Sequence, residues 1–212
     1  MELNLTPEGL ITAYANGIFP MGDPWGGISW YAPDPRAIIE LDDFHVSSTL
    51  RQTCRQGRFE LCVSRDFAGV IRACADRPDG SWITDEVIGA YEALHGLGLA
   101  HSVEAWQDGE LAGGLYGVAL GGAFFGESMF HRVRDASKVA LVLLVERMRE
   151  RGLVLLDIQY LTPHLKRFGA VEISRRDYLR RLRQAIRMGV SFADPPPTPS
   201  ERPARGTGAR RR

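Results

Sequence analysis

Three strand-like runs joined by two tight turns constrain this chain more than any other feature. Residues 101 to 107 alternate between apolar and polar side chains, and residues 110 to 120 and 123 to 129 form two further strand-like runs. Asp108-Gly109 and Gly121-Gly122 separate the runs, and such dipeptides are typical of hairpin turns. The pattern predicts an antiparallel meander at the centre of the fold.

Helix and strand signals alternate on both sides of this meander. Helices are predicted over residues 6–17, 66–75, 84–97, 136–151, 163–168 and 176–188, and further strands over 59–63, 153–158 and 171–174. The order of these elements predicts an α+β fold, a GNAT-like acyltransferase with a mixed, largely antiparallel sheet. No Gln/Arg-x-x-Gly-x-Gly/Ala motif for coenzyme A follows the meander, which favours another acyl donor.

The chain is predicted to have three parts. Residues 1–40 are expected to form a small N-terminal subdomain, in which residues 18–36, rich in glycine, proline and aromatic residues, form a loop. Residues 41–192 are expected to form the GNAT-like catalytic domain. Residues 193–212, rich in proline and arginine, are expected to be a disordered tail.

Composition excludes several classes of protein. Of the 212 residues, 44% are hydrophobic and 25% are charged, as in ordinary globular proteins. No apolar run approaches the roughly 20 residues that cross a bilayer, and the first residues do not resemble a signal peptide. The chain is therefore expected to be cytoplasmic, with no membrane partner.

Cysteine and histidine give no sign of a metal or of disulfides. The three cysteines are an odd number without a Cys-x-x-Cys pair, and the five histidines have no metal-ligand spacing. The sequence predicts neither a metal site nor a cofactor.

Glu127 is a candidate binding residue. It follows a strand glycine and lies among aromatic residues and a methionine. An unpaired carboxylate in apolar surroundings is costly, which suggests a use such as binding a substrate ammonium group. The alternative is an ion pair with Arg132 or Lys138 at the end of the sheet, and the sequence leaves both readings open.

Asp157 and Gln159 are candidate catalytic residues. They lie two apart at the end of an apolar strand, so both side chains should project to one face. Asp157 could handle a proton or bind an ammonium, and Gln159 could orient a carbonyl. The alternative is a helix cap and an amide that bonds to the backbone.

An arginine stripe is predicted on the last helix. Its members recur at spacings of 4, 3 and 4, which places them on one face: Arg176, Arg180, Arg183 and Arg187. Contact with a nucleic-acid backbone is one interpretation, and a solvated helix face is the other.

Several unusual motifs together resemble the bacterial leucyl/phenylalanyl-tRNA–protein transferase family. They run in order along the chain: AYANGIFP (13–20), WYAPDPR (30–36), SWIT (81–84), AYEALH (90–95), HSVE (101–104), GGLYG (113–117), GESMF (126–130), DASK (135–138), DIQ (157–159) and RRDY (175–178).

The resemblance implies a reaction and its substrates. The family transfers leucine or phenylalanine, and sometimes methionine, from aminoacyl-tRNA to the N-terminal Arg or Lys of a protein, which creates an N-degron for proteolysis. It implies a small N-terminal domain, a GNAT-like domain and no cofactor. The arginine stripe would then contact the tRNA.

The resemblance also implies roles for individual residues. Asp157 and Gln159 resemble the catalytic pair, and Glu127 resembles the residue that binds the aminoacyl amino group. The side-chain pocket would be formed by Leu115, Phe124, Met148 and Leu156, and the surroundings of the terminal adenosine by Trp82, Tyr14 and Tyr91. Leu115, Met148 and His131-Arg132 depart from the family's usual residues, which leaves the preference among the three amino acids open.

Three alternative functions remain at this point. One is leucyl transfer to N-terminal Asp or Glu, and another is a non-catalytic tRNA-binding module. The third is a coenzyme A-dependent acetyltransferase.

Overall fold

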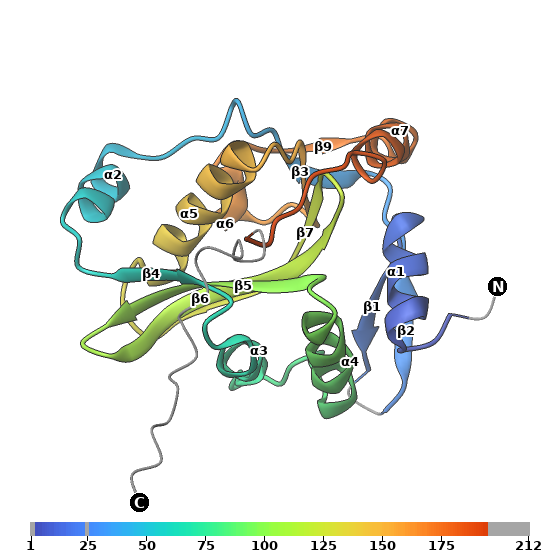
Figure 1. Ribbon diagram of the computed structural model, residues 1–212, viewed down its shortest axis with the longest axis horizontal. Helices are drawn as coiled ribbons and strands as arrows, with labels where there is room; N and C mark the ends of the chain where they lie inside the picture. Colours follow the sequence, from blue (N-terminus) through green and yellow to red (C-terminus); the bar gives the residue numbers. More distant parts are fainter. Residues whose placement is uncertain (1–2, 24–25, 195–212) are drawn as a thin grey trace, which may run out of the picture.

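The computed structural model describes residues 3 to 23 and 26 to 194 of the chain. Its centre is a seven-stranded sheet with the strand order β4-β5-β6-β7-β8-β3-β9 (Figure 1). The strands are β3 (Arg36–Ile39), β4 (Glu60–Val63), β5 (Ala100–Gln107), β6 (Glu110–Leu120), β7 (Ala123–His131), β8 (Leu155–Gln159) and β9 (Ala170–Ile173). Two short strands, β1 (Phe19–Gly22) and β2 (Ile28–Tyr31), form a separate hairpin.

Seven helices surround the sheet in the described part of the chain. They are α1 (Pro7–Ala15), α2 (Ser48–Arg55), α3 (Phe67–Ala75), α4 (Asp85–Gly96), α5 (Ala136–Glu150), α6 (Pro163–Lys166) and α7 (Arg175–Ala185). None of those helices combines the length and apolar character needed to cross a bilayer.

The predicted antiparallel meander is confirmed. Strands β5, β6 and β7 pair in antiparallel order, with Val103 opposite Leu115 and Leu115 opposite Met129. Asp108 and Gly109 both have positive φ angles, +53° and +81°, as a tight hairpin between β5 and β6 requires. The turn residues therefore set the register that places the later site residues.

Strands β7 and β8 pair only over part of their length. They run parallel, and their last paired residues are Phe125 and Asp157. Beyond this point β7 continues to His131 beside β6, while β8 ends at Gln159 beside β3. The two strands therefore separate in the middle of the sheet.

The sheet buries one apolar layer on each face. Because side chains alternate along a strand, the neighbours Phe124 and Phe125 enter different core clusters. Phe124 belongs to the cluster under α5, which packs on β5 and β6. Phe125 belongs to the cluster that contains residues of α1, α3, α4 and α7. Figure 1 shows α5 on the opposite side of the sheet from α3 and α4.

The caps predict helix starts well. The side chains of Thr6, Asp66 and Thr84 accept hydrogen bonds from backbone N–H groups of the first turns of α1, α3 and α4. The predicted helices and strands are confirmed, with ends that differ by up to three residues.

Four elements were not predicted. The hairpin of β1 and β2 lies in residues 18–36, so the prediction of a loop there is wrong. Strand β3 is four residues long and buried on both faces, which removes the alternation that marks a strand. Helix α2 buries only Leu50 and Thr53, so its apolar face is too narrow to be recognised.

The predicted domain boundaries stay predictions. Strand β3 lies within predicted residues 1–40 but is part of the large sheet. Most of the predicted tail, residues 195–212, lies outside the described residues. Asp194 is described, and its carboxylate forms an ion pair with Arg147 at 2.8 Å.

Candidate active site

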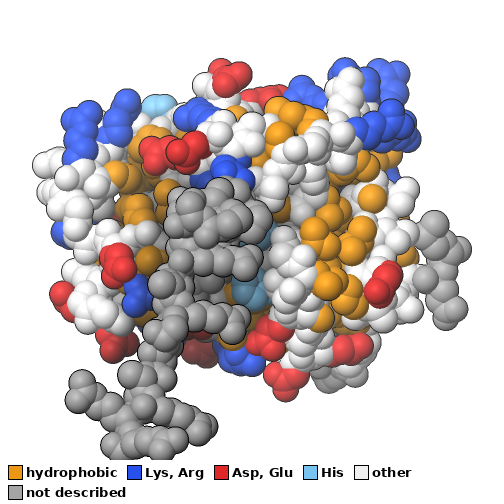
Figure 2. Space-filling view, viewed as in Figure 1, with side chains coloured by type: hydrophobic (Ala, Val, Ile, Leu, Met, Phe, Trp, Pro, Cys, Tyr) orange, Lys and Arg blue, Asp and Glu red, His pale blue; other side chains and the backbone are white. Residues whose placement is uncertain are grey.

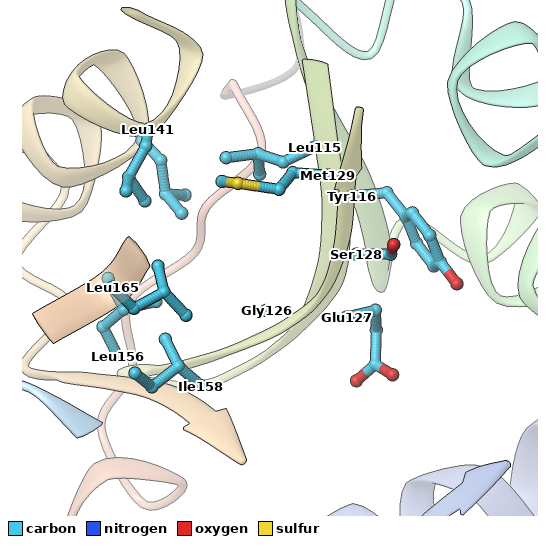
Figure 3. A pocket seen from close by; sticks show the side chains of 11 residues that line it. Leu115, Tyr116, Gly126, Glu127, Ser128, Met129, Leu141, Leu156, Ile158 and Leu165 are labelled. Carbon is cyan, nitrogen blue, oxygen red and sulfur yellow. The ribbon is translucent and has the colours of Figure 1, made fainter. Parts of the chain in front are cut away.

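An apolar cavity of about 90 Å³ lies where β7 and β8 separate. Leu115 and Met129 line it from β6 and β7, and Leu156 and Ile158 from β8. Helices α5 and α6 contribute Leu141, Leu144 and Leu165, and Tyr116, Gly126, Glu127 and Ser128 also line the cavity. Figure 3 shows the leucine, isoleucine and methionine side chains facing one another, whereas the Glu127 side chain, at the edge of the cavity, projects from the other side of the strand. The site can hold a small apolar group next to an acid.

Glu127 is held by neutral donors. The Tyr14 hydroxyl donates to Oε1 at 2.7 Å, the Gln159 side-chain amide donates to the same oxygen at 3.0 Å, and the Tyr91 hydroxyl donates to Oε2 at 3.3 Å. Tyr14 and Tyr91 are fully buried, and their hydroxyl groups are in hydrogen-bonding contact, so the two phenols, with one hydrogen each, share their donors between each other and Glu127. The donors fix the carboxylate beside the cavity without neutralising its charge.

The ion-pair reading of Glu127 is wrong. Arg132 donates to the backbone oxygen of Leu111 at 3.2 Å, and Lys138 pairs with Asp135 at 2.7 Å. Within residues 3–23 and 26–194, no lysine or arginine pairs with Glu127. The carboxylate is therefore available to a cation from outside the protein.

The protonation of Glu127 is balanced near neutral pH. Burial raises the pKa of its carboxyl group to about 7, and the hydrogen bonds from Tyr14 and Gln159 act in the opposite direction. An ammonium ion next to this group would favour the ionised form. Binding of a cation and ionisation of Glu127 are thus coupled.

Asp157 is fully buried, and donors occupy both of its oxygens. Arg36 binds it with two hydrogen bonds, from Nε to Oδ1 at 2.9 Å and from Nη2 to Oδ2 at 2.6 Å. The Tyr178 hydroxyl donates to Oδ2 at 2.6 Å and the Gln159 backbone N–H donates to Oδ1 at 2.9 Å. A carboxylate offers about four acceptor sites, so little capacity remains to take a proton from a substrate. The geometry favours a positioning role for Asp157.

Gln159 adopts an unusual backbone conformation. Its φ is +64°, in the left-handed region that residues other than glycine rarely occupy. The hydrogen bond from its N–H to Asp157 accompanies this conformation, and its side-chain amide reaches Glu127. Such departures occur at functional sites, where surrounding contacts hold them in place.

Arg36 is a site residue that the sequence analysis missed. Its guanidinium lies 4.7 Å from the ring centres of both Phe19 and Tyr178, and it donates to the backbone oxygen of Gly17 at 3.3 Å. It is almost fully buried. The available signal was its place at the end of the WYAPDPR segment, although nothing in that segment indicates its partner Asp157.

Only half of the predicted side-chain pocket lies at the cavity. Leu115 and Leu156 line it, but Phe124 and Met148 do not. Phe124 is buried with its ring 4.9 Å from that of Phe192, and Met148 lies one helical turn beyond Leu144. Phe124 and Met148 belong to the same buried cluster as Leu115 and Leu156, and their part in the side-chain pocket stays a prediction.

Three aromatic residues predicted near an adenosine have other surroundings. The rings of Tyr14 and Tyr91 have no exposed surface on which a base could stack, so that assignment is not supported for them. Trp82 is half-buried, and its backbone oxygen accepts a hydrogen bond from the Gly22 N–H at 3.0 Å. Its contact with an adenosine stays a prediction.

The arginine stripe is exposed as the helical spacing predicts. All four arginines lie on the surface, whereas Leu182 of α7 is buried. Arg187 comes after the end of α7 at Ala185, so only three of the four are on this helix. Arg180 forms an ion pair with Asp177 at 3.4 Å. Figure 2 shows lysine and arginine side chains gathered over α7. Contact between this stripe and RNA stays a prediction.

A metal centre is not apparent in the described part of the chain. No group of three or more His, Cys, Asp or Glu side chains could hold a metal ion there. The three cysteines are free, and Cys74 is buried.

Comparison with known proteins gives consistent matches. The family profile described as "Leucyl/phenylalanyl-tRNA protein transferase" matches residues 38–183, and the profile of that family's N-terminal domain matches residues 4–34. A protein named leucyl/phenylalanyl-tRNA–protein transferase from Rubrobacter xylanophilus is 57% identical over 90% of this chain and all of its own length. One from Gloeobacter violaceus is 55% identical over 91% of this chain and all of its own.

Among solved structures, L-PGS from Bacillus licheniformis is similar over 75% of this chain and 55% of its own. The identity is 17% and the TM-score is 0.41, which is too weak for a conclusion about the fold.

Proposed function

The chain belongs to the leucyl/phenylalanyl-tRNA protein transferase family, and we propose that it transfers leucine or phenylalanine from aminoacyl-tRNA to the N-terminus of acceptor proteins. It is an aminoacyltransferase. In the structure, the proposal rests on one observation. The half-buried carboxylate of Glu127, which has no cationic partner among the described residues, lies at a cavity lined by leucines. An esterified leucine or phenylalanine carries an ammonium group and an apolar side chain that match these two features.

The proposed reaction joins the acceptor's amine to the ester carbonyl carbon. Glu127 binds the ammonium group of the donor amino acid, and the apolar side chain enters the cavity. The Gln159 amide donates to the carbonyl oxygen as negative charge develops on it. The new C–N bond forms, the C–O bond of the ester breaks, and the ribose oxygen takes up the proton that the amine loses. Because the ester is already activated, alignment of the two reactants is the main requirement.

Finer parts of the proposal rest on the resemblance rather than on the site. They are methionine as a third donor, Arg or Lys at the acceptor's N-terminus, formation of an N-degron, and a cytoplasmic location. A GNAT-type fold is also proposed, with support from the element order β4 to α7 and the parallel pair of β7 and β8.

We expect Gln159→Ala and Asp157→Ala to abolish transfer of labelled leucine from charged tRNA to an arginine-starting protein. The first variant removes the donor to the carbonyl oxygen, and the second removes the acceptor that holds the Gln159 backbone. Circular dichroism shows whether each variant is folded. Full activity in both folded variants would reject the catalytic assignments.

A competition assay tests the acceptor. With arginine-starting and aspartate-starting peptides present together, labelled leucine is expected only on the former. Labelling of the aspartate peptide would instead support leucyl transfer to N-terminal Asp or Glu. Binding of tRNA without any transfer would support a non-catalytic module.

Binding of the donor is expected to weaken below neutral pH. Puromycin carries an aminoacyl group on a nucleoside through an amide, so it can bind without reacting. Because the Glu127 pKa is about 7, puromycin affinity should rise roughly fivefold from pH 6 to pH 7 as the carboxyl ionises. Isothermal calorimetry at several pH values measures this rise in affinity, and the rise should be absent in Glu127→Gln. If the affinity of that variant rises with pH as in the wild type, the pH dependence belongs to another group.

A further inference from the structure

A second cavity, of about 360 Å³, lies between α1 and α7, which are at the same edge of the molecule (Figure 1). Three residues of α7 line it at spacings of four, which places them on one face of that helix: Arg175, Leu179 and Arg183. The other side is formed by α1 and the chain next to it: Leu3, Thr12, Ala13, Ala15, Asn16 and Ile18. We call this space the α1/α7 cavity. Its volume is in the range of about 300–1,000 Å³ that is usual for small-molecule sites.

Direct contact between the two segments sets the width of the α1/α7 cavity. Gly17 follows α1 with a φ of +70°. A Cβ atom at this position would lie 2.7 Å from the Tyr178 ring and 3.0 Å from the Leu179 side chain. Because α7 packs this closely on the end of α1, the cavity beside the contact is a fixed gap between the two helices.

The cationic groups of the α1/α7 cavity have no acid to balance them. The described residues that line it include two arginines and neither Asp nor Glu. Within residues 3–23 and 26–194, Arg175 and Arg183 form no ion pair. The nearby Asp34 carboxylate accepts a hydrogen bond at 3.0 Å from the backbone N–H of Arg175. An excess of positive charge in a confined space favours an anionic ligand.

The Arg175 guanidinium gives an independent sign of a missing ligand. Its Nη1 atom is buried and has no hydrogen-bond partner among the described residues. By contrast, the Thr12 hydroxyl donates to the Glu8 backbone oxygen at 2.7 Å, and the Asn16 amide donates to that of Thr12 at 2.8 Å. A buried donor without an acceptor is costly, so an anion next to Arg175 would remove this cost. The planar guanidinium matches the paired oxygens of a carboxylate or a phosphate.

The remaining lining of the α1/α7 cavity is apolar. It consists of Leu3, Ala13, Ala15, Ile18 and Leu179. A bare inorganic ion would leave this surface without contacts, and so would a sugar–phosphate backbone, which is polar along its whole length. An apolar chain attached to the anion would cover it, and each buried methylene would strengthen binding by up to about fourfold.

We propose that the α1/α7 cavity binds a small organic anion, in which a carboxylate or phosphate group is joined to an apolar body. Arg175 and Arg183 bind the charged group, and the apolar lining covers the rest. Such a ligand differs from the aminoacyl-tRNA and the acceptor protein of the proposed function, and the cavity shares none of its lining with the described residues around the leucine-lined cavity.

The position of the α1/α7 cavity connects it to the candidate active site. Helix α1 carries Tyr14, whose hydroxyl donates to Glu127 at 2.7 Å, and α7 carries Tyr178, whose hydroxyl donates to Asp157 at 2.6 Å. A ligand that contacts both helices stabilises the donors that hold both acids without entering the leucine-lined cavity.

Binding of octanoate and octyl phosphate to the full chain tests the inference. Isothermal calorimetry should give a Kd below about 1 mM for at least one of them, which also distinguishes a carboxylate from a phosphate site. Octanol, which has the same chain without the charge, should bind at least about tenfold more weakly. Arg175→Gln should weaken binding of the anion at least about tenfold. Arg176→Gln is the matched control and should bind as the wild type does, because Arg176 is exposed and does not line the cavity.

Several outcomes would overturn the inference. They are the absence of binding by both anions, equal affinity in the wild type and Arg175→Gln, and equal weakening in Arg176→Gln, which would indicate general surface charge. If neither anion binds, a lower Tm in Glu2→Gln would identify an acid of the chain itself, outside the described residues, as the partner of Arg175.

A role of Arg175 in binding RNA would also overturn the inference. It would appear as a raised KM for leucyl-tRNA in Arg175→Gln with unchanged affinity for both anions. The calorimetric measurements do not depend on catalysis, so they decide the inference even if the protein transfers no leucine. If Arg175→Gln does not fold, Arg183→Gln replaces it in the binding assay, because the Arg183 side chain is exposed and lines the same cavity.

Discussion

Replacing Arg36 with methionine is expected to lower the free energy of unfolding by about 3–5 kcal/mol and to abolish aminoacyl transfer. The substitution leaves Asp157 buried with a charge that only Tyr178 and the Gln159 N–H still contact. A buried charge without its ionic partner is among the most costly defects in a protein core. Urea denaturation measures the stability, and transfer is assayed where the variant is folded.

A double variant separates the structural cost from the effect on activity. Arg36→Met combined with Asp157→Asn removes the unpaired charge, so stability should recover in part. Activity should stay absent because the backbone of Gln159 has lost its charged acceptor. An Arg36→Met protein that unfolds within 1 kcal/mol of the wild type would show that the ion pair contributes little. Recovery of activity in the double variant would mean that the Asp157 charge is not required.

Replacing Glu127 with glutamine is expected to reduce transfer from leucyl-tRNA by roughly 10- to 100-fold. Glutamine keeps the size of the side chain and an acceptor oxygen for Tyr14, but it loses the charge that binds an ammonium group. The loss should appear mainly in the KM for the donor. Steady-state kinetics with varied leucyl-tRNA measure it.

The same variant should also change how stability depends on pH. The folded pKa of Glu127, about 7, lies above its ordinary value, so its contribution to stability is present at low pH and is lost as pH rises through 7. The wild type should therefore lose more stability between pH 5 and pH 8 than Glu127→Gln does, as measured by Tm. Glu104→Gln is the matched control, since Glu104 is a buried acid on β5 that does not line the cavity. If Glu104→Gln reduced transfer as much as Glu127→Gln does, the assignment of ammonium binding to Glu127 would be wrong.

Local signals in the sequence predicted most of the fold. Turn residues and alternation placed the meander, and caps such as Thr84 placed the starts of helices, because these features depend on neighbours in the chain. Strand β3 was missed because its pairing with β8 and β9 depends on residues more than 100 positions away. The parallel pairing of β7 and β8 could not be predicted from the sequence either, because no local signal determines where two distant strands stop pairing.

The sequence pointed to chemically distinctive residues of the candidate site but did not indicate the shape of the cavity. Motifs identified Glu127, Asp157 and Gln159, and the structure brings their side chains or backbones into one network. Of the four residues predicted for the side-chain pocket, Leu115 and Leu156 line the cavity and the other two do not. The sequence cannot rank equally apolar residues such as Phe124 and Leu156, because only packing decides which one faces the open space. Arg36 was missed because a buried ion pair cannot be read from either partner alone.

Both acids of the candidate site, Glu127 and Asp157, are hydrogen-bonded by side chains from the first 40 residues of the chain. Tyr14 and Glu127 are 113 positions apart, and Arg36 and Asp157 are 121 positions apart. A protein under synthesis therefore remains inactive until Asp157 has left the ribosome and folded against a segment made much earlier. A fragment that begins after residue 40 would keep the strands around the cavity but lack both holding groups. Because the site joins residues from both ends of the fold, aminoacyl transfer can begin only after most of the chain has been synthesised.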